Sequence, residues 1–254
     1  MSYIKISFLT SDDLLAVEAS KELRNKYGSY KLEEAHVIVA LGGDGFMLQA
    51  LHDTMHLSLP VYGMNFGTIG FLMNDFSSNL LIERLTSAEE TVINPLAMTA
   101  YCFDGTKKTA LAINEVSLIR SSSQAAKLRV LIDGKERMKE LVCDGALVST
   151  PAGSTAYNYS AHGPILPIDA DILALTAMAA YRPRRWRGAV LSSKAQILFE
   201  TLDWDKRPVS AVADSVEVTN VLKVMIQSNK EIKHKLLFDP GHGLEERLIS
   251  EQFS

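Results

Sequence analysis

Cysteine, aromatic residues and long apolar runs are all scarce in this sequence of 254 residues, in which aromatic residues make up 7%. The two cysteines, Cys102 and Cys143, belong to no CxxC or Cys/His cluster with zinc-ligand spacing, so we expect buried free thiols and no structural zinc site. The most apolar stretch, residues 172–181, is roughly half of the ~20 residues that a membrane-spanning helix needs. The N-terminus shows no basic segment followed by a long apolar run, so we expect no secretory signal and a cytoplasmic location.

A basic excess is missing as well. The formal net charge is -4 and the pI is about 5.9, whereas proteins that grip nucleic-acid backbones usually carry a clear positive excess. Nucleic acid is therefore not an expected partner. What the chain does have is 47% hydrophobic and 22% charged residues, which is enough for a sizeable core in one large or two modest domains.

The first ninety residues alternate between strand-like and helix-like segments. Residues 3–9 read as a strand, and Asp12 and Asp13 offer cap-type side chains before a helix that runs to about Lys26. A second strand at 36–41 leads through a glycine-rich turn to helical spacing over 46–56, and a short third strand follows at 61–65. This alternation predicts an α/β domain with a parallel sheet, whose ligands bind beyond the carboxyl ends of its strands.

After about Val92 the pattern becomes largely β. Polar turns at Asp104-Gly105 and Asp133-Gly134 are typical of hairpins, and residues 209–226 alternate as strands do. We also predict a helix over residues 169–180 and a smaller helical start near Ser154. Residues 238–241 mark a break before a short polar C-terminal segment.

The turn Gly42-Gly43-Asp44-Gly45 lies between a buried-looking strand and a helix, where backbone amides and the helix N-terminus suit phosphate. It is not a P-loop, since no Gly-Lys-Ser/Thr follows, and it lacks the third glycine of GxGxxG. Asp44 is either a helix cap or a group that works through a metal or a substrate hydroxyl, because a bare carboxylate repels phosphate. The turn alone does not decide between these readings.

Asn114 and Glu115 lie just before an apolar alternation. An amide beside a carboxylate can recognise a base edge or ribose hydroxyls. Because adjacent strand residues point to opposite faces, either the strand begins or bends at this pair and both reach a ligand, or one of them is structural. Taken alone, the pair is more typical of surface residues.

Residues 149–160 form a run of small and hydroxyl residues that follows Cys143-Asp144-Gly145 and an apolar strand. Pro151 and Gly153 fix a turn, and we expect Ser154 or Thr155 to cap a helix whose free amides meet a ligand. A capped helix start without a ligand is the alternative. So many small residues beside Tyr157 favour the close approach of a flat nucleotide.

Four arginines gather in residues 182–187. Such a cluster can bind phosphates, stack on a base, or contact a second nucleotide or a neighbouring subunit, although an exposed charged loop is the commoner explanation in an acidic protein. His162 has no second histidine or carboxylate at ligand spacing, so we assign it no chemistry.

Taken together and in this order, the GGDG turn, Asn114-Glu115 and residues 144–157 resemble the NAD kinase family, including its bacterial inorganic polyphosphate/ATP-NAD kinases. The resemblance extends from about residue 37 to residue 241, with residues 63–71 fitting a further family pattern, while the first thirty residues match only in outline. GGDG alone also occurs in diacylglycerol kinase-like and phosphofructokinase-like proteins. The run at 149–157 favours NAD kinase among these.

The resemblance implies an α/β domain of residues 1–92 joined by a returning segment, 240–254, and a β-rich, sandwich-like NAD-binding domain of residues 93–239. It implies transfer of a phosphoryl group from ATP, or from polyphosphate, to the 2′-hydroxyl of the adenosine ribose of NAD, giving NADP. Mg²⁺ is expected on the donor phosphates rather than on a dedicated set of protein ligands. NAD and ATP are then the partners, with no nucleic acid and no membrane, and the protein is expected to be a homodimer or homotetramer.

By motif matching, Asp44 would take the proton from the 2′-hydroxyl, and Gly42, Gly43 and Gly45 would shape the phosphate turn. Asn65 and Phe71 would line the pocket. The residues that the resemblance assigns to NAD binding are Asp44, Gly45, Asn114, Glu115, Asp144, Ala152, Thr155, Ala156, Tyr157, Asn158 and Ser160.

The sequence departs from the family pattern at four positions. Phe46 stands where a threonine commonly follows GGDG, Val142 where many members have a basic residue, Ala152 at a frequent hydroxyl position, and His162 at a glycine of the usual Ala-Gly-Gly-Pro. Two alternatives stay open, a lipid or sugar kinase that shares GGDG and a non-catalytic NAD(P)-binding sensor. The phosphoryl donor, the acceptance of NADH and the oligomeric state are not fixed by the sequence.

Overall fold

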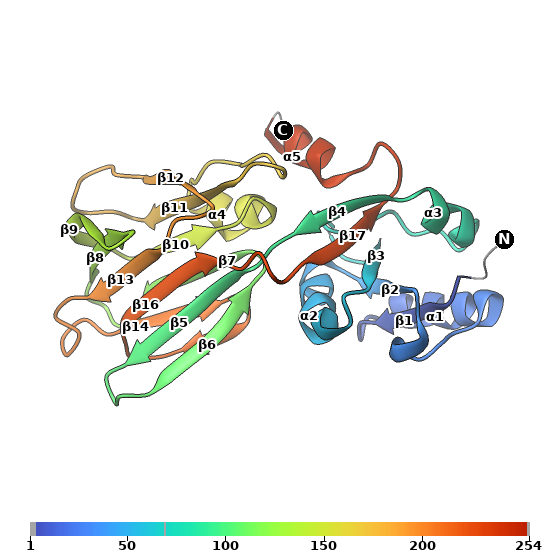
Figure 1. Cartoon of the computed structure of the whole chain (residues 1–254), viewed down its shortest axis with the longest axis horizontal. Helices are drawn as coiled ribbons and strands as arrows, with labels where there is room; N and C mark the ends of the chain where they lie inside the picture. The colour runs from blue at the N-terminus through green and yellow to red at the C-terminus, as the bar shows by residue number, and fades with distance from the viewer. Residues whose placement is uncertain (1–3, 69, 253–254) are drawn as a thin grey trace. The chain divides into compact units, whose positions relative to one another are not determined.

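The computed structural model describes residues 4–68 and 70–252, so the expected first residue of the opening strand, Tyr3, lies outside the described residues. The chain divides into two units, Met1–Ile93 with Ile232–Ser254, and Asn94–Glu231 (Figure 1). Cys102 and Cys143 are buried free thiols, as predicted. Over the described residues, no helix combines the length and the apolar character that a membrane crossing requires.

The first unit is built on a five-stranded sheet with the order β1-β2-β3-β17-β4. The pairs β1/β2, β2/β3 and β3/β17 are parallel, while β4 runs antiparallel to β17 at the edge, so the predicted parallel sheet is confirmed. In sheet order the strands span Ile6–Thr10, Val37–Gly42, Pro60–Asn65, His234–Phe238 and Glu89–Ile93.

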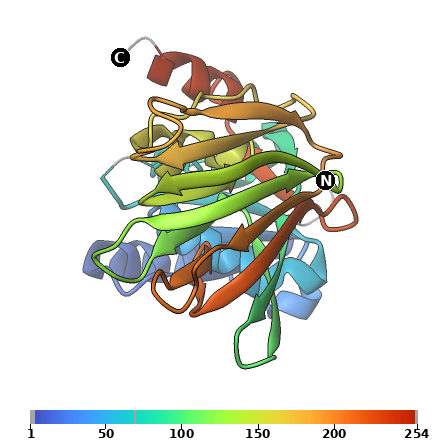
Figure 2. The ribbon, with the colours of Figure 1, turned by 90° about the vertical axis from the view of Figure 1, so that its left-hand side faces the viewer.

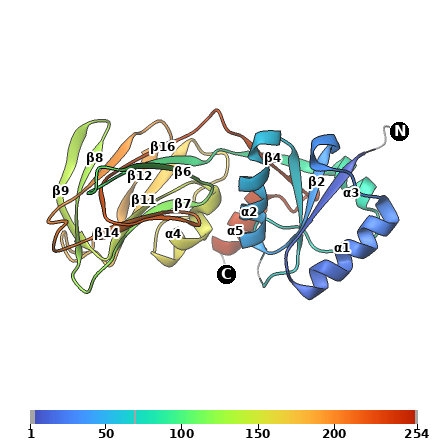
Figure 3. The same cartoon turned by 90° about the horizontal axis from the view of Figure 1, so that it is seen from below.

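Helices cover both faces of this sheet (Figure 3). The helices of the unit are α1 (Leu14–Tyr27), α2 (Asp44–Thr54), α3 (Leu81–Ser87) and α5 (Leu244–Gln252), with 3-10 turns η1 (Leu32–Glu34) and η2 (Met55–Leu57). The Asp13 carboxylate caps α1 by accepting from the amides of Leu15 and Ala16 at 2.9 and 3.2 Å, as predicted. Apolar residues of α1 and α3 share one core cluster with Tyr62 and Met64. Met47 of α2 packs beside Gly63, on the opposite face.

The second unit consists of two six-stranded antiparallel sheets, and Figure 2 looks onto its strands. One sheet has the order β12-β11-β10-β7-β14-β15, with strands Gly188–Ser192, Ile172–Met178, Gly145–Ser149, Glu115–Arg120, Val209–Ala213 and Val216–Val218. The other has the order β6-β5-β16-β13-β8-β9, with strands Lys107–Ala112, Leu96–Cys102, Val221–Ser228, Ile197–Thr201, Ala126–Ile132 and Lys135–Cys143.

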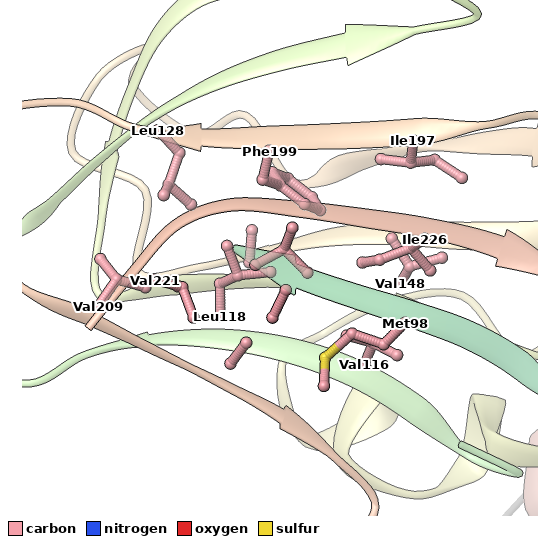
Figure 4. Packing of buried hydrophobic residues seen from close by; sticks show 14 of the residues in the cluster. Met98, Val116, Leu118, Leu128, Val148, Ile197, Phe199, Val209, Val221 and Ile226 are labelled. Carbon is pink, nitrogen blue, oxygen red and sulfur yellow. The ribbon is translucent and has the colours of Figure 1, made fainter. Parts of the chain in front are cut away.

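A single apolar core joins the two sheets, as the sandwich-like prediction requires. Val116, Leu118 and Val148 of one sheet pack against Phe199 and Ile226 of the other (Figure 4). In the second of these sheets, strands β5, β8 and β16 alternate buried and less buried positions, because one face of the sheet lies on this core. The core therefore sits between the sheets.

The predicted helix over residues 169–180 is wrong, because residues Ile172–Met178 form strand β11. The strand lies between β10 and β12, and six of its seven residues are buried. A continuous apolar run of this length fits a strand buried on both faces as well as a helix, and pairing on both edges decides for the strand. The hairpins expected at Asp104-Gly105 and Asp133-Gly134 are confirmed, joining β5 to β6 and β8 to β9.

The expected domain division needs a correction at its second boundary. The expected β-rich domain ended at residue 239 and so included strand β17, His234–Phe238. In the structure this strand pairs with β3 and β4 of the first unit. Its apolar residues complete the parallel sheet, which explains why the chain returns to the first unit at Ile232 rather than at residue 240. The first boundary lies after Ile93, against the expected residue 92.

Candidate functional site

Asp44 is the first residue of α2, yet its carboxylate does not cap that helix. Gly43 occupies the N-cap, and the two Asp44 oxygens accept from the backbone amides of Phe71 and Leu72, each at 2.8 Å. The helix-cap reading of Asp44 is therefore wrong. The carboxylate is partly buried and fixed by a segment about thirty residues further along the chain, whose Phe71 was expected near this site.

The three glycines of the turn have different surroundings. A side chain on Gly42 would meet Phe46 at 2.7 Å, and one on Gly43 would meet Gly67 at 3.3 Å, so both positions are filled by neighbouring groups. At Gly45 a side chain would find open space within 4 Å. The open side of the turn is therefore at Gly45, next to Asp44, where a ligand meets least obstruction.

The segment after β3 is held against this turn by backbone and side-chain hydrogen bonds. Phe66 donates its amide to the Gly42 carbonyl at 2.7 Å, and Asn65 Oδ1 accepts from the Gly67 amide at 2.9 Å. From α5, Arg247 Nη1 donates to the Gly70 carbonyl at 2.6 Å. Asn65, expected to line the pocket, thus shapes the turn that follows it.

In the second unit, Asn114 and Glu115 lie where β7 begins, which is the arrangement in which both side chains can reach a ligand. Asp214 anchors this point. Its carboxylate accepts from the amides of Ile113 at 2.6 Å and Asn114 at 3.1 Å, and its own amide donates to the Glu115 carbonyl at 3.3 Å. Asp214 occupies the tight turn between β14 and β15, with a left-handed φ of 47°.

Thr150 and Gly153 fix the same backbone from the other side. Thr150 Oγ1 donates to the Ile113 carbonyl at 2.7 Å and accepts from the Gly153 amide at 3.0 Å. A side chain on Gly153 would lie 2.3 Å from the Asn114 carbonyl oxygen, so only glycine permits this close approach. The turn that includes Ala152 is therefore packed directly on the Asn114 backbone.

The surroundings of Glu115 disfavour the charged form of its carboxyl group. Burial, together with the nearby Asp214 carboxylate, raises its pKa from 4.5 to about 7, although a backbone hydrogen bond from Tyr157 acts in the opposite direction. Glu115 Oε2 is buried and finds no hydrogen-bond partner among the described residues. A buried, unsatisfied carboxylate oxygen is suited to accept from a ligand hydroxyl or amino group.

The segment after Pro151 forms a 3-10 turn η3 (Ala152–Thr155) and a four-residue helix α4 (Tyr157–Ser160). The expected side-chain cap is wrong, because neither Ser154 nor Thr155 caps α4. Ser154 Oγ instead donates to the Pro151 carbonyl at 2.7 Å and accepts from the Leu166 amide at 3.0 Å, which ties the turn to the following loop.

Residues 155–160 of this segment divide between exposed or partly buried positions and one fully buried position. Tyr157 and Tyr159 are 40% and 45% exposed, Ser160 is exposed, and Thr155 and Ala156 are partly buried. Asn158, by contrast, is fully buried. Its amide nitrogen donates to the carbonyls of Ser154 and Pro164, and its oxygen accepts from Thr176 Oγ1 at 2.6 Å. Asn158, expected to bind NAD, has a side chain engaged inside the unit.

Asp144 is not brought to this cluster. It precedes β10, whose Gly145 pairs with Ile119 while Ser149 pairs with Glu115, so Asp144 and Glu115 lie at opposite ends of the same strand pair. Its half-exposed carboxylate pairs with Arg120 Nε at 2.6 Å. Within this chain the structure gathers Asn114, Glu115 and Tyr157, and it leaves Asp144 apart from them.

Asp214 is the main residue that sequence reasoning missed. It stands in Ala213-Asp214-Ser215, between two alternating segments, and an aspartate at such a place is an ordinary hairpin-turn signal. Only the pairing of β14 with β7 brings it beside Glu115. For metal, no group of three or more His, Cys, Asp or Glu side chains among the described residues has the spacing of a binding site.

Comparison with known proteins covers both units. The family model described as the ATP-NAD kinase N-terminal domain matches residues 12–91, and that of the ATP-NAD kinase C-terminal domain matches residues 113–231. The chain is 60% identical over 249 residues to an NAD kinase of Cereibacter sphaeroides, covering 98% of each chain. It is 56% identical to an NAD kinase of Caulobacter vibrioides, covering 98% of this chain and 96% of the other.

Two solved structures share the fold at low sequence identity. A yeast NADH kinase crystallised with NADH has a TM-score of 0.82 and 18% identity, covering 98% of this chain and 87% of the other. An NAD kinase from Archaeoglobus fulgidus in complex with ATP has a TM-score of 0.77 and 22% identity, covering 98% of each chain. By these matches along nearly its whole length, the chain belongs to the NAD kinase family.

Proposed function

We propose that this protein is a magnesium-dependent NAD kinase, which transfers the terminal phosphoryl group of ATP to the 2′-hydroxyl of the adenosine ribose of NAD. The products are NADP and ADP. The observation that carries the proposal is the Asp44 carboxylate, held in a glycine turn that is open at Gly45. The family membership of both units supports it independently.

Asp44 is the proposed general base. Each of its oxygens accepts one backbone amide, and a carboxylate has about four lone-pair positions, so each oxygen keeps capacity for another hydrogen. Two backbone bonds hold the group in one orientation, which favours proton abstraction from a correctly placed hydroxyl. Asp44 would take the 2′-hydroxyl proton as the oxygen attacks the terminal phosphorus and ADP leaves.

The second unit supplies the proposed contacts to NAD. The Asn114 amide group and the Glu115 carboxylate would bind ribose hydroxyls or the edge of the adenine, and the exposed Tyr157 ring offers a face for a flat base. Ala152, Thr155, Ala156 and Ser160 belong to the turn and short helix around this ring. Asp144 has no proposed contact with a nucleotide held by these residues of the same chain.

A magnesium ion fits this chemistry without a protein cage. Mg²⁺ commonly binds substrate phosphates together with one or two carboxylates and water, and Asp44 is a partly exposed carboxylate beside the open turn. When bound, the metal would neutralise charge on the donor phosphates. Residues of the protein, rather than the metal, would orient the acceptor hydroxyl and remove its proton.

The test is NADP formation from NAD, ATP and Mg²⁺, compared between wild type, Asp44→Asn and Asp53→Asn. Asp53 is an exposed aspartate on the same helix and makes the matched control. We expect Asp44→Asn to lower kcat by about 10²- to 10⁴-fold with a much smaller change in the KM for NAD, and the control to match wild type. Most of the turnover remaining in a folded Asp44→Asn protein would show that Asp44 is not the base.

The same assay separates the alternatives. Diacylglycerol or fructose phosphate in place of NAD tests the lipid and sugar kinase readings, and polyphosphate in place of ATP tests the second donor. Tight NAD binding without any NADP formed would favour the sensor. No specific observation favours that reading, since the departures at Phe46 and Val142 leave Asp44, Asn114 and Glu115 in place.

We further propose that the chain assembles as a homodimer or homotetramer. The family resemblance motivates this, and light scattering on the purified protein tests it. A monomer at assay concentration would contradict it.

A further inference from the structure

We propose that Arg247, on the C-terminal helix α5, is a positioning residue for the Asp44 carboxylate. The inference rests on the proposed function, because it takes Asp44 to be the general base. Arg247 acts on that carboxylate through a single peptide group, the one that joins Gly70 to Phe71. All of these residues belong to the first unit.

This peptide group connects Arg247 to Asp44 directly. Its carbonyl, that of Gly70, accepts from Arg247 Nη1 at 2.6 Å, and its amide, that of Phe71, donates to Asp44 Oδ2 at 2.8 Å. The carbonyl and the amide hydrogen of a trans peptide group lie in one plane and point in opposite directions. A side chain that fixes the carbonyl therefore also fixes the direction from which the amide approaches the carboxylate.

A second amide of the same turn binds the carboxylate. Leu72 donates to Asp44 Oδ1 at 2.8 Å, and the Met73 amide donates to the Gly70 carbonyl at 3.2 Å. Phe71 and Leu72 are thus the two central residues of a four-residue turn, and both of their amides bind the base. The orientation of this turn sets the orientation of the Asp44 carboxylate.

Arg247 is well placed to hold the turn, because its guanidinium is fixed at other points. Its Nε donates to the His242 carbonyl at 3.1 Å, and the group lies over the Phe238 ring, 5.8 Å from the ring centroid. The guanidinium therefore joins the returning segment to the Gly70 carbonyl. Its positive charge also polarises the peptide group, which strengthens the hydrogen bond that the Phe71 amide donates to the carboxylate.

The simpler explanation is that Arg247 only fastens α5 to the first unit. Arg24 is an arginine of that kind. It donates to the Phe8 carbonyl and lies over the Phe8 ring, 5.6 Å from the centroid. Phe8 lies inside β1 and pairs with Val39, so Arg24 supports the sheet rather than the turn that binds Asp44. Arg24 is therefore the matched control.

The test compares NADP formation by wild type, Arg247→Ala, Arg247→Lys and Arg24→Ala. We expect Arg247→Ala to lower kcat by about tenfold or more and to change the KM for NAD by less than about threefold, because the base loses its orientation while the contacts to NAD remain. Arg247→Lys keeps the charge and a donor, so its loss should be smaller. Arg24→Ala should keep kcat within about twofold of wild type.

Two further measurements separate positioning from general support of the fold. Added to Asp44→Asn, Arg247→Ala should lower the residual kcat by less than about twofold, since a residue that acts through the base has little effect once the base is gone. Amide hydrogen exchange at Phe71 and Leu72 should become about tenfold faster or more in Arg247→Ala, and it should stay at the wild-type rate in Arg24→Ala.

The inference is overturned if Arg247→Ala and Arg24→Ala lower kcat equally, or if the loss caused by Arg247→Ala is as large in Asp44→Asn as in wild type. Wild-type exchange rates at Phe71 and Leu72 in Arg247→Ala would overturn it as well. A wild-type protein that forms no NADP would overturn the proposed function together with this inference. NADP formed by wild type, with kcat retained in Arg247→Ala, would overturn this inference alone.

Discussion

At Glu115, burial and the nearby Asp214 carboxylate together raise the pKa of the side chain. Its carboxylate faces Asp214 and is mostly withdrawn from water, and one oxygen has no hydrogen-bond partner among the described residues. A buried carboxylate oxygen without a hydrogen-bond donor lowers the stability of the folded protein. A ligand that donates a hydrogen bond to this oxygen removes that cost. Under the proposed function, protonation of Glu115 links pH, folding and nucleotide binding.

The first expectation concerns stability against pH. The folded protein holds the Glu115 proton up to about pH 7, whereas the unfolded chain loses it near 4.5, so this group makes the folded state less stable as pH rises through that window. Glu115→Gln removes the penalty, on the order of 3 kcal/mol at full ionisation. Urea unfolding of both proteins from about pH 5 to about pH 8 should show the variant gaining on wild type as pH rises. A constant difference across the window would contradict the shifted pKa.

The second expectation concerns Asp214. Asn tolerates the left-handed backbone at this position but keeps only one carbonyl oxygen for the two amides that the carboxylate accepts. Asp214→Asn should weaken NAD binding by about tenfold, because the start of β7 loses an anchor. It should also lower the pKa of Glu115, since a like charge is removed.

The measurement is the NAD dissociation constant across pH. In the variant, the pH at which affinity changes should move below that of wild type. Glu217→Gln, on the exposed side of the same hairpin, is the control and should behave as wild type. An unmoved midpoint would separate Asp214 from the titration of Glu115.

Asn114, Glu115 and Tyr157 were grouped in one site because their motifs, taken in order, resemble those of the NAD kinase family; taken alone, Asn114-Glu115 is more typical of surface residues. Asp214 could not be added, since it lies 101 residues after Ile113, and only the pairing of β14 with β7 and its own hydrogen bonds to Ile113 and Asn114 bring it beside Glu115. Nor could the motif tell that Asn158 points inward. Hydrogen bonds to Thr176 and Pro164 decide that, and they belong to the tertiary structure.

At the scale of elements, the short helix α4 places an exposed side chain, Tyr157, next to a buried one, Asn158. We expect Asn158→Ala to lower the free energy of unfolding by about 2–4 kcal/mol, because it removes three hydrogen bonds and leaves buried partners unsatisfied. Tyr157→Ala should leave stability nearly unchanged and weaken NAD binding by about tenfold or more, as stacking on a base is lost.

Thermal unfolding and calorimetric NAD titration on the two variants check this contrast. The reverse pattern, with stability lost at Tyr157 and affinity alone lost at Asn158, would contradict it. Neighbouring residues of the same motif then serve as controls for one another.

The elements that were predicted correctly are those that a few neighbouring residues specify, such as a helix cap or a hairpin turn. Asp13 caps α1, and the Asp133-Gly134 turn closes a hairpin, because both depend on local chemistry. Strand β11 was mistaken for a helix because Ile, Leu, Ala and Met suit a buried helix as well as a strand between two partners. Strand β17 was assigned to the wrong unit, since pairing with β3 across more than 170 residues leaves no local mark.

At the scale of the whole molecule, the second unit is a continuous stretch inserted into the first. Residues 94–231 contain both antiparallel sheets and their shared core, whereas the sheet of the first unit needs a strand from each side of that insertion. Asp239, directly after β17, attaches this returning segment to the first unit. Its carboxylate accepts hydrogen bonds from Tyr62 Oη at 2.7 Å and from Arg84 Nε at 3.1 Å. The first unit is therefore incomplete without residues 232–254.

We expect a fragment of residues 94–231 to unfold cooperatively on heating, since its core is self-contained. A fragment of residues 1–93 should lack a cooperative transition, and adding residues 232–254 as a separate peptide should restore one. Circular dichroism melts of the fragments and of the mixture provide the measurement. Cooperative folding of 1–93 alone would show that β17 is dispensable.

The late position of β17 also sets an order of events during synthesis. A ribosome releases the chain from its N-terminus, so the whole inserted unit emerges before the strand that lies between β3 and β4. Until then the β3 edge offers unpaired backbone groups to any passing strand. During synthesis, the second unit is therefore complete while the first unit still lacks β17. At that stage the unpaired edge of β3 is exposed to misassembly and to binding by chaperones.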